Sequence, residues 1–329
     1  MIVVDGRVFG GRATGIQRVA RGAFDAARAQ GLTAEVVAPR GVTDPRVDRH
    51  LATGSSRGYE QLALPLHARN RTVLSLANTA PLLVRHSAVF VHDLGPSTHP
   101  EWFAPRMRLY AKAVVAAARR ADVVMTPSQA IADEVTALGL RGSVHVVRPA
   151  TDLTPATPAD VEALREKHGL ARPYAVLLGW ADPRKDLATA LAAHRRAREV
   201  VPHDLVLLGS PHPNLAPVEL PPDAVHLGAV SDVELRAVLT GAHVLLHPSR
   251  YEGFGLPPLE AAACGTASLV GDVPAVREAT HDLMPVLPLG DVDAWADALV
   301  DAIRHRQPVP ALPTWTWTDT GAGLLRALT

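Results

Sequence analysis

Short runs of branched apolar residues alternate along the chain with longer segments whose apolar positions recur every three or four residues. The short runs are typical of buried strands, and the longer amphipathic segments are typical of helices. Their alternation predicts the α/β fold class, with doubly wound parallel sheets covered by helices on both faces. In the first half of the chain the predicted strands are residues 2–4, 34–38, 73–76, 88–91, 122–125 and 144–147, and the predicted helices are residues 17–29, 105–120 and a segment from the capping Ser128 to Gly139.

A second series of the same kind follows a proline-rich connection, Arg148 to Pro158. Proline cannot donate a backbone hydrogen bond, so this segment suits an exposed linker. Because a single core stops growing near about 250 to 300 residues, we expect two Rossmann-like domains, residues 1–155 and 156–308, with a ligand in the cleft between them. In the second half the predicted strands are residues 174–178, 205–208, 244–246 and 267–270, and the predicted helices are residues 186–199, 232–240, 257–264 and 291–305.

The charge and cysteine content excludes several classes of protein. The chain has 33 basic and 33 acidic side chains and a formal net charge of zero, and it has no basic run, so nucleic acid is not an expected partner. Cys264 is the sole cysteine, which excludes an internal disulfide and a cysteine-based zinc site and favours a reducing compartment. No apolar stretch is long enough to span a membrane. We therefore expect a cytoplasmic protein whose membrane association, if any, is peripheral; its oligomeric state stays open.

The segment from His247 to Gly265 carries the strongest candidate site. A strand ends at His247, a glycine-bearing loop follows, and two prolines begin a helix, where a missing N–H is tolerated. The backbone N–H groups of Gly255 and Leu256 then face outward at the positive end of the helix, which favours an anion. Glu252 in the loop and Glu260 in the helix add two carboxylates. The alternative is that Glu260 complements the helix dipole and the glycines only form a turn.

Residues 177–191 form a second candidate. A strand ends at Gly179, and the adjacent cations Arg184 and Lys185 come just before a helix that starts near Asp186. Cations at the carboxyl end of a parallel strand suit a diphosphate, and Lys185 is one of only three lysines in a chain that otherwise uses arginine. The alternative is a solvated basic pair in a turn.

Two weaker features follow strands of the first half. His92 and Asp93 come at the end of an apolar strand, where they could contact a ligand, although packing of His92 and a turn cap by Asp93 explain them equally well. The glycine-rich segment from Asp5 to Arg18, which includes Gly15, allows close approach of the backbone to a ligand, but its spacing does not match a dinucleotide fingerprint.

An Asp-x-Asp pair at Asp291 and Asp293 does not indicate a metal site. The pair follows Gly290 and opens an amphipathic helix, where aspartate is common as a cap and in the first turn. We therefore expect no metal.

The segment from Glu252 to Gly265 resembles the E-x7-E motif of the retaining GT-B glycosyltransferases of family 4, and ADPRKDL, ending at Leu187, resembles that family's E-P-R-K-N segment. The resemblance covers nearly the whole chain. Further segments that resemble the family occur in the expected order: GIQRV (15–19), EQLALP (60–65), VHDLGP (91–96), VMTPSQAIADEV (124–135) and VHLGAVSDVELRAVL (225–239).

The resemblance implies a role for each of these segments. The second domain would hold a nucleotide diphosphate sugar and the first domain the acceptor, with no further cofactor, and the last segment, residues 309–329, would cross back onto the first domain. By position, Glu260 would bind the ribose hydroxyls and Arg184 with Lys185 the diphosphate. The remaining contacts would come from Glu252 and the backbone of Gly253, Phe254, Gly255 and Leu256 to the sugar and phosphates, from the backbone at Val230 to the base, from His92 to the sugar near its reacting carbon, and from Gly15 to the ligand.

The resemblance thus implies an enzyme that transfers a hexose to a hydroxyl of a glycan, lipid-linked or small-molecule acceptor. GDP-mannose is the first donor to test, because the PRKD segment resembles those of mannosyltransferases. The resemblance implies retention of configuration without a metal, with His92, Glu252 and Lys185 as the catalytic group. Trp180 stands where some members of the family place an arginine for the phosphates, and Asp182 and Asp186 replace the usual Glu and Asn. We therefore expect diphosphate binding to rely more heavily on Lys185. The alternatives are a nucleotide-sugar epimerase and a non-catalytic module that binds nucleotide sugars.

Overall fold

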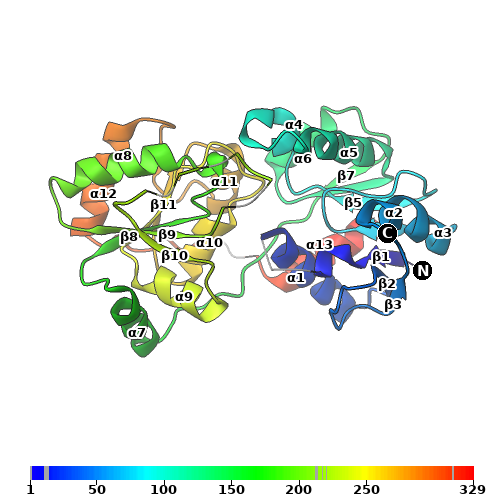
Figure 1. The fold of residues 1–329 in the computed structure, drawn as a ribbon, viewed down its shortest axis with the longest axis horizontal. Coiled ribbons are helices and arrows are strands. Elements are labelled where there is room, and N and C mark those ends of the chain that lie inside the picture. The colour runs from blue at the N-terminus through cyan, green and yellow to red at the C-terminus, as the bar shows by residue number, and fades with distance from the viewer. Residues whose placement is uncertain (1, 11–14, 212–213, 217, 220, 313–314) are drawn as a thin grey trace. The chain divides into compact units, whose positions relative to one another are not determined.

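The computed structural model describes residues 2–10, 15–211, 214–216, 218–219, 221–312 and 315–329. The chain divides into two compact units. Unit 1 comprises Met1–Thr98, Arg108–Ala150 and Thr314–Thr329, and unit 2 comprises His99–Met107 and Thr151–Pro313. Each unit contains one parallel sheet between helices (Figure 1).

The sheet of unit 1 has the strand order β3-β2-β1-β4-β5-β6-β7, and every pairing is parallel. The chain runs outward from β1 to β3 and then returns to place β4 on the other side of β1, so the direction of winding reverses between β1 and β4. The C-terminal helix α13 packs against α1 (Figure 1). The strands are β1 (Ile2–Asp5), β2 (Ala34–Pro39), β3 (Arg49–Leu51), β4 (Val73–Ser75), β5 (Ser87–Phe90), β6 (Val123–Thr126) and β7 (Ser143–Val146). The helical elements are η1 (Gly6–Phe9), α1 (Gly15–Ala29), α2 (Ser56–Gly58), η2 (Tyr59–Ala63), α3 (Leu64–Ala68), α4 (Gly95–Thr98), α5 (Met107–Arg120), α6 (Gln129–Thr136) and α13 (Trp317–Leu328).

The sheet of unit 2 repeats this plan with the order β10-β9-β8-β11-β12-β13, again all parallel. Here the winding reverses between β8 and β11. The strands are β8 (Tyr174–Leu178), β9 (Asp204–Leu208), β10 (Val225–Gly228), β11 (Val244–His247), β12 (Ser268–Gly271) and β13 (Val286–Leu287). The helical elements are η3 (Pro100–Trp102), α7 (Pro158–His168), η4 (Pro183–Lys185), α8 (Leu187–Arg198), α9 (Asp232–Gly241), α10 (Leu256–Ala263), α11 (Pro274–Thr280) and α12 (Val292–Arg304).

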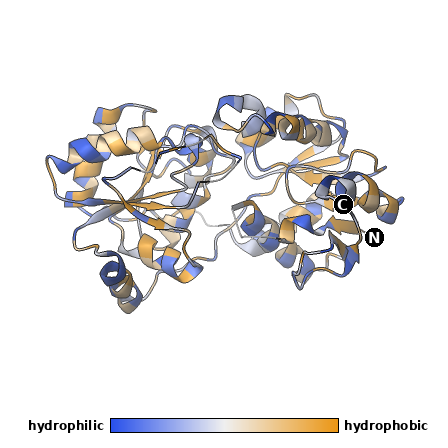
Figure 2. Cartoon of the chain, in the orientation of Figure 1, coloured by the Kyte–Doolittle hydropathy of each residue, from blue (hydrophilic) through white to orange (hydrophobic). Residues whose placement is uncertain are grey.

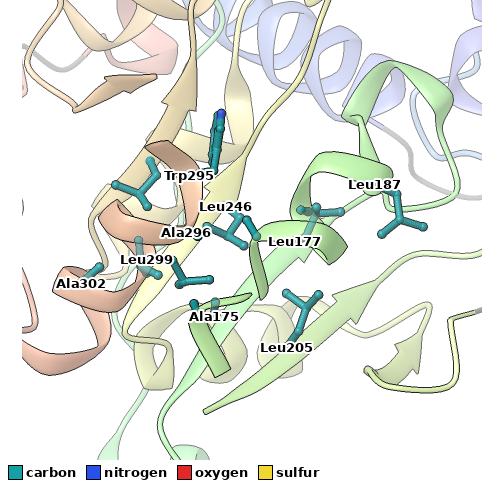
Figure 3. Packing of buried hydrophobic residues seen from close by; sticks show 14 of the residues in the cluster. Ala175, Leu177, Leu187, Leu205, Leu246, Trp295, Ala296, Leu299 and Ala302 are labelled. Atoms are coloured by element: carbon teal, nitrogen blue, oxygen red, sulfur yellow. The ribbon is translucent and has the colours of Figure 1, made fainter. Parts of the chain in front are cut away.

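Alternate residues of the central strands β8, β9 and β11 of unit 2 supply two separate cores. Ala175 and Leu177 of β8 face helices α8 and α12, where Trp295 is fully buried. Figure 3 shows part of this cluster, including Leu177, Leu205 and Leu246 on their strands. Tyr174 and Val176 face the opposite side, in the core that α7, α9 and α10 cover. Because side chains alternate along a strand, apolar residues at both sets of positions are needed when both faces are covered. Figure 2 shows mostly apolar colouring on the central strands of both sheets.

The predicted fold class of two doubly wound parallel sheets is confirmed, and each predicted strand lies within one residue of an observed one. The strands that the pattern missed are β3, β10 and β13, all at sheet edges. An edge strand is half exposed and so lacks a continuous apolar run, as the exposed residues of β3 illustrate. Helix α7 was also missed, because it buries a single residue, Leu164, and has no apolar stripe. Helix α11 was missed as well, because its seven residues are too few for a recurring apolar pattern.

The units differ from the predicted domains at their boundaries and in one internal segment. Unit 1 ends at Ala150 instead of residue 155, and the last segment joins it from Thr314 instead of residue 309. His99–Met107 was expected in the first domain, whereas it belongs to unit 2. Phe103 forms an isolated antiparallel bridge with Leu215, and Ala104 N donates to Asn214 O at 3.0 Å. These backbone contacts, which hydropathy does not report, attach the segment to unit 2.

Candidate functional site

Lys185 and Glu252 lie at the point in unit 2 where the winding of the sheet reverses. Lys185 follows β8 and Glu252 follows β11, and these strands are neighbours although they are distant in sequence. Open α/β sheets bind ligands at this position, beyond the carboxyl ends of the two strands that flank the reversal, because the loops there diverge to opposite faces. The fold therefore brings the two strongest predicted segments together.

Local backbone geometry presents Lys185. Gly179 follows β8 with a φ of +71°, a conformation that favours glycine. A Cβ at Gly209 would approach Gly179 Cα to 3.3 Å, so glycine at 209 also suits the close contact of the two loops. Asp182 then caps the short helix η4 by accepting a hydrogen bond from Arg184 N at 3.0 Å. Asp186 ends η4 in a left-handed conformation, with φ 46°, and caps α8. Lys185 is thus fixed between two aspartate caps.

Lys185 and Glu252 form a largely buried ion pair. Lys185 Nζ donates to Glu252 Oε1, and each side chain is 13% exposed. His247 Nε2 lies 3.2 Å from the same carboxylate oxygen. Burial alone would raise the pKa of Glu252, but the Lys185 charge and the His247 contact hold that pKa well below its ordinary value. Burial lowers the pKa of His247. At neutral pH the site therefore holds an ionised carboxylate, an ammonium and a neutral imidazole.

Arg184 is held beside Lys185 by a bidentate contact. Its Nη2 and Nε donate to Asp182 Oδ2 at 2.6 and 3.0 Å, and its guanidinium lies 5.5 Å from the ring centroid of Phe103. Arg250 joins the two loops, because its Nε donates to Asp186 Oδ2 at 2.8 Å and its backbone N donates to Arg184 O at 2.8 Å. The two loops are therefore one braced unit.

The N-terminus of α10 has the predicted form. Gly255 is its N-cap residue with φ 114°, no side-chain hydrogen bond caps the helix, and the prolines at 257 and 258 fall in the first turn. A Cβ on Gly255 would lie 3.3 Å from Val276 Cα. Glycine therefore permits both the backbone conformation and the close packing at this positive helix end, which Gly253 and Phe254 precede in the loop.

Glu260 is 7% exposed in α10. Burial, followed by the nearby Glu260 charge, raises the pKa of Cys264 to about 11, so the thiol is protonated at neutral pH. Cys264 itself is buried in the core that α7, α9 and α10 cover.

The backbone at Val230 follows β10, two strands from β8. Gly209 N donates to Gly228 O at 2.8 Å, and Trp180 Nε1 donates to Gly209 O at 2.9 Å. Trp180 is 2% exposed, so its indole closes the gap between the ends of β8 and β9. Ser231 then caps α9 in a reciprocal arrangement with Glu234.

The predicted residues of the first half lie in unit 1. His92 is buried, its Nε2 lies 2.9 Å from Leu76 O, and its backbone N donates to Asn78 Oδ1 at 2.6 Å. A carbonyl can only accept, so Nε2 carries the proton and Nδ1 is an acceptor. Burial lowers the pKa of His92, and the ring is neutral at pH 7. Asp93 Oδ1 accepts from Gly95 N at 2.9 Å, which is the turn cap weighed from the sequence.

Gly15 begins α1. The part of the predicted glycine-rich loop at residues 11–14 lies outside the described residues.

The reading of the Asp-x-Asp pair as a helix cap is confirmed, because Asp291 Oδ1 accepts from Ala294 N at 3.1 Å and Asp293 pairs with Arg196. Within the described ranges, no group of three or more His, Cys, Asp or Glu side chains is placed to hold a metal ion. Among the same residues, no helix combines the length and apolar character required to cross a membrane.

Sequence reasoning missed His247 and Arg250 as parts of this site. Both stand in the segment HPSRYEG, which was examined for its glycines and glutamates. The signal for His247 was its place as the last residue of an apolar strand; Arg250 gives no such signal, because its partner Asp186 is remote in sequence.

The chain is similar to several known proteins. Residues 172–305 match the family model described as "Glycosyl transferases group 1". The chain is 26% identical over 271 residues to an O-antigen chain mannosyltransferase B of Escherichia coli, covering 75% of this chain and 67% of that protein. It is 33% identical over 256 residues to a D-inositol 3-phosphate glycosyltransferase of Actinosynnema mirum, covering 70% of this chain and 59% of that protein. The chain thus spans about three fifths to two thirds of the length of these curated relatives.

Solved structures show the same fold. HepE of Anabaena, determined with UDP and glucose, superposes with a TM-score of 0.67 at 17% identity, covering 99% of this chain and 94% of that one. Sucrose-phosphate synthase of Thermosynechococcus elongatus gives a TM-score of 0.70 at 20% identity, covering 99% and 98%. The predicted GT-B class of fold is confirmed by these likenesses. Residues 172–305 form a domain of the group 1 glycosyl transferase family.

Proposed function

We propose that the protein is a glycosyltransferase that moves a hexose from a nucleotide diphosphate sugar to a hydroxyl of a glycan, lipid-linked or small-molecule acceptor, with retention of configuration and without a metal. The observation that carries this proposal is the buried contact of Lys185, Glu252 and His247 beyond the ends of β8 and β11. It lies inside the segment that matches the glycosyl transferase family.

An ammonium has three donors, and the contact with Glu252 uses one of them. The other two are available to diphosphate oxygens, while Glu252 fixes the position of the ammonium. The remaining acceptor sites of Glu252 suit sugar hydroxyls, which donate to carboxylates. One contact thus explains how a single pocket would recognise both the sugar and the diphosphate.

Arg184 and the end of α10 supply further positive potential. Arg184 is oriented by Asp182, and the N–H groups of Gly255 and Leu256 lie at a helix end without a side-chain cap. Such donors bind phosphate because the helix dipole adds to the hydrogen bonds. We place the ribose hydroxyls at Glu260 and the base at the backbone of Val230, as the resemblance to the family implies.

The chemical step that we propose breaks the bond between the anomeric carbon and the diphosphate oxygen. The acceptor oxygen bonds to the same face of the sugar, and its proton passes to the departing phosphate. Negative charge grows on that phosphate in the transition state, so preorganised cations and N–H groups would lower the barrier; losing one such donor commonly costs about 2.7 to 4 kcal/mol. The neutral ring of His92, whose Nδ1 is an acceptor, suits a hydroxyl of the donor sugar.

GDP-mannose is the first donor to test, because several relatives bear mannosyltransferase names. UDP-glucose is the second, because HepE was solved with UDP and glucose. No specific observation favours the epimerase or binding-module alternatives. A cytoplasmic location remains part of the proposal.

The test measures nucleoside diphosphate release from each donor with a panel of acceptors, and the anomeric configuration of the product by NMR. We expect acceptor-dependent release and an α-linked product from an α-linked donor. Interconversion of the donor sugar without release would identify an epimerase, and binding without any turnover would identify a binding module. An inverted product would contradict the proposed stereochemistry while leaving transfer intact.

A further inference from the structure

Unit 1 contains a second copy of the turn that holds Arg184. Asp5 ends β1 as Asp182 follows β8, and each accepts a hydrogen bond from the backbone N of the arginine two residues later. Arg7 contacts Asp5 through Nη2 at 2.6 Å and Nε at 3.0 Å, the same distances as in the pair of Arg184 and Asp182. Each turn follows the first strand of its sheet, at the reversal of winding. Unit 1 therefore presents an arginine at the position where such sheets bind ligands.

The turn of Asp5 and Arg7 in unit 1 differs in charge from the turn of Asp182 and Arg184 in unit 2. Arg7 Nη2 also lies 2.7 Å from Glu60 Oε1 of η2, and the side chains of Asp5 and Glu60 are 5% and 9% exposed. Burial alone would raise the pKa of Glu60, but Arg7 lowers it below the ordinary value. Burial also disfavours the charge of Arg7, yet Asp5 and Glu60 hold its pKa above the ordinary value. One cation thus stands between two carboxylates, which gives the three side chains a formal net charge of minus one.

Other polar groups lie near the triad of Asp5, Arg7 and Glu60. Burial raises the pKa of Tyr110 to about 12, with Asn78 in hydrogen-bonding contact and the charges of Asp93 and Glu60 nearby. The phenol therefore keeps its proton and can both donate and accept. Asn78 Oδ1 is in turn occupied by the backbone N of His92. Asn78 therefore links this cluster to the segment of His92 and Asp93.

Ser75 supplies an observation of a different kind. It is 1% exposed, and in the described part of the chain its Oγ has no hydrogen-bond partner. Val4 pairs with Leu74 across β1 and β4, so Ser75 is the neighbour of Asp5, and partners in register point to the same side of a sheet. A buried hydroxyl without a partner costs free energy unless something else completes it.

We propose that this cluster, comprising Arg7, Glu60, Ser75, Asn78 and Tyr110 with Asp5 as the support of Arg7, binds hydroxyl groups of an uncharged sugar acceptor and discriminates against anionic acceptors. Sugar hydroxyls can donate to Glu60 and accept from Arg7. They can also donate to or accept from the hydroxyl groups of Ser75 and Tyr110, which are both donors and acceptors. A phosphate would meet carboxylates on both sides of the one guanidinium and is disfavoured. The inference rests on the proposed glycosyl transfer, because it identifies the ligand as the acceptor.

A purely structural role explains the triad less well. Taking charges out of water costs several kcal/mol for each ion, and replacement of buried ion pairs by apolar residues is often neutral or stabilising. A structural role also leaves Ser75 Oγ without a partner. A ligand hydroxyl bound at the carboxyl ends of β1 and β4 would explain both the buried charges and the hydroxyl of Ser75.

The experiment compares methyl α-D-mannoside with mannose 6-phosphate as acceptors, with the donor that the wild type uses. We expect kcat/KM for the uncharged acceptor to exceed that for the phosphate by at least about tenfold. Glu60→Gln should increase the acceptor KM by a factor at least ten times larger than the factor for the donor KM. It should also reduce the ratio of kcat/KM for the uncharged acceptor to kcat/KM for the phosphate. Tyr110→Phe, which keeps the aromatic ring, should raise the acceptor KM and leave the ratio of kcat/KM for the two acceptors unchanged. Asp133→Asn removes an exposed carboxylate of α6 in the same unit and should change neither KM.

Equal use of both acceptors by the wild type, or an unchanged acceptor KM in Glu60→Gln and Tyr110→Phe, would overturn the inference. If thermal unfolding shows that Glu60→Gln is misfolded, the acceptor KM of Tyr110→Phe decides the test. If the wild type releases no nucleoside diphosphate from any donor, the proposed function fails. Saturation-transfer NMR with the two sugars then decides whether the cluster binds the uncharged one alone.

Discussion

Replacement of Lys185 by alanine tests the site at its centre. The substitution removes the ammonium and leaves the Glu252 carboxylate buried beside a neutral imidazole. Removing a preorganised charge-stabilising donor costs about 2.7 to 4 kcal/mol of transition-state free energy, or about 10²- to 10³-fold in rate. We therefore expect kcat/KM to fall by at least tenfold, measured as nucleoside diphosphate release from GDP-mannose or UDP-glucose.

Lys167→Ala is the matched control. Lys167 also pairs with a glutamate in unit 2, Glu234, but its side chain is 61% exposed. Exposed pairs contribute about 0 to 1 kcal/mol, so this variant should stay within about twofold of the wild type. Lys185→Arg keeps the positive charge and should retain more activity than Lys185→Ala.

The pH profile separates loss of charge from loss of fold. Without Lys185, burial dominates and the pKa of Glu252 rises from its lowered value. The carboxylate then accepts a proton at higher pH, so the acid limb of kcat/KM should shift upward in Lys185→Ala and stay in place in Lys167→Ala. Unchanged kcat/KM in both Lys185→Ala and Glu252→Ala would refute the assignment of this site.

Three other predictions concern the scaffold. Gly255→Ala should weaken nucleotide binding in calorimetry, because φ 114° and the nearby Val276 backbone oppose a Cβ; unchanged affinity would argue against a role for this helix end. Burial, then the neighbouring His203, lowers the pKa of His194 to about 4. The unfolded chain takes up this proton below about pH 6.5 and the folded chain does not, so unfolding free energy should fall by up to about 1.4 kcal/mol per pH unit from 6.5 to 4. In urea unfolding His194→Gln should flatten that slope, and an equal slope would contradict the assignment. Trp295→Ala empties a fully buried site and should cost unit 2 about 3 to 5 kcal/mol in the same assay; a loss below 1 kcal/mol would mean that the core of α8 and α12 collapses to fill the space.

Much of the fold could be predicted because both sheets are buried on two faces. Strands such as Tyr174–Leu178 then require apolar residues at every position, which gives an unbroken run in the sequence. Edge strands such as Arg49–Leu51 have no such requirement. The attachment of His99–Met107 to unit 2 depends on backbone hydrogen bonds near Asn214, and these leave no trace in hydropathy.

The site was predictable where chemistry clusters locally. Lys185 and Glu252 each stand in a segment with glycines, charges and a helix start, and only the strand order shows that they meet. The partnership of Arg7 with Glu60 could not be read from the sequence, since the two are separated by β2 and β3 and Glu60 lies in a π-helical turn without a strong pattern.

The position of a bound nucleoside diphosphate tests the central claim most directly. A crystal structure of the protein with GDP or UDP, chosen by calorimetry, should show the diphosphate beyond the ends of β8 and β11, with its oxygens on Lys185 Nζ and on the N–H groups at the start of α10. A diphosphate bound elsewhere on the molecule, with the pair of Lys185 and Glu252 untouched, would contradict the account.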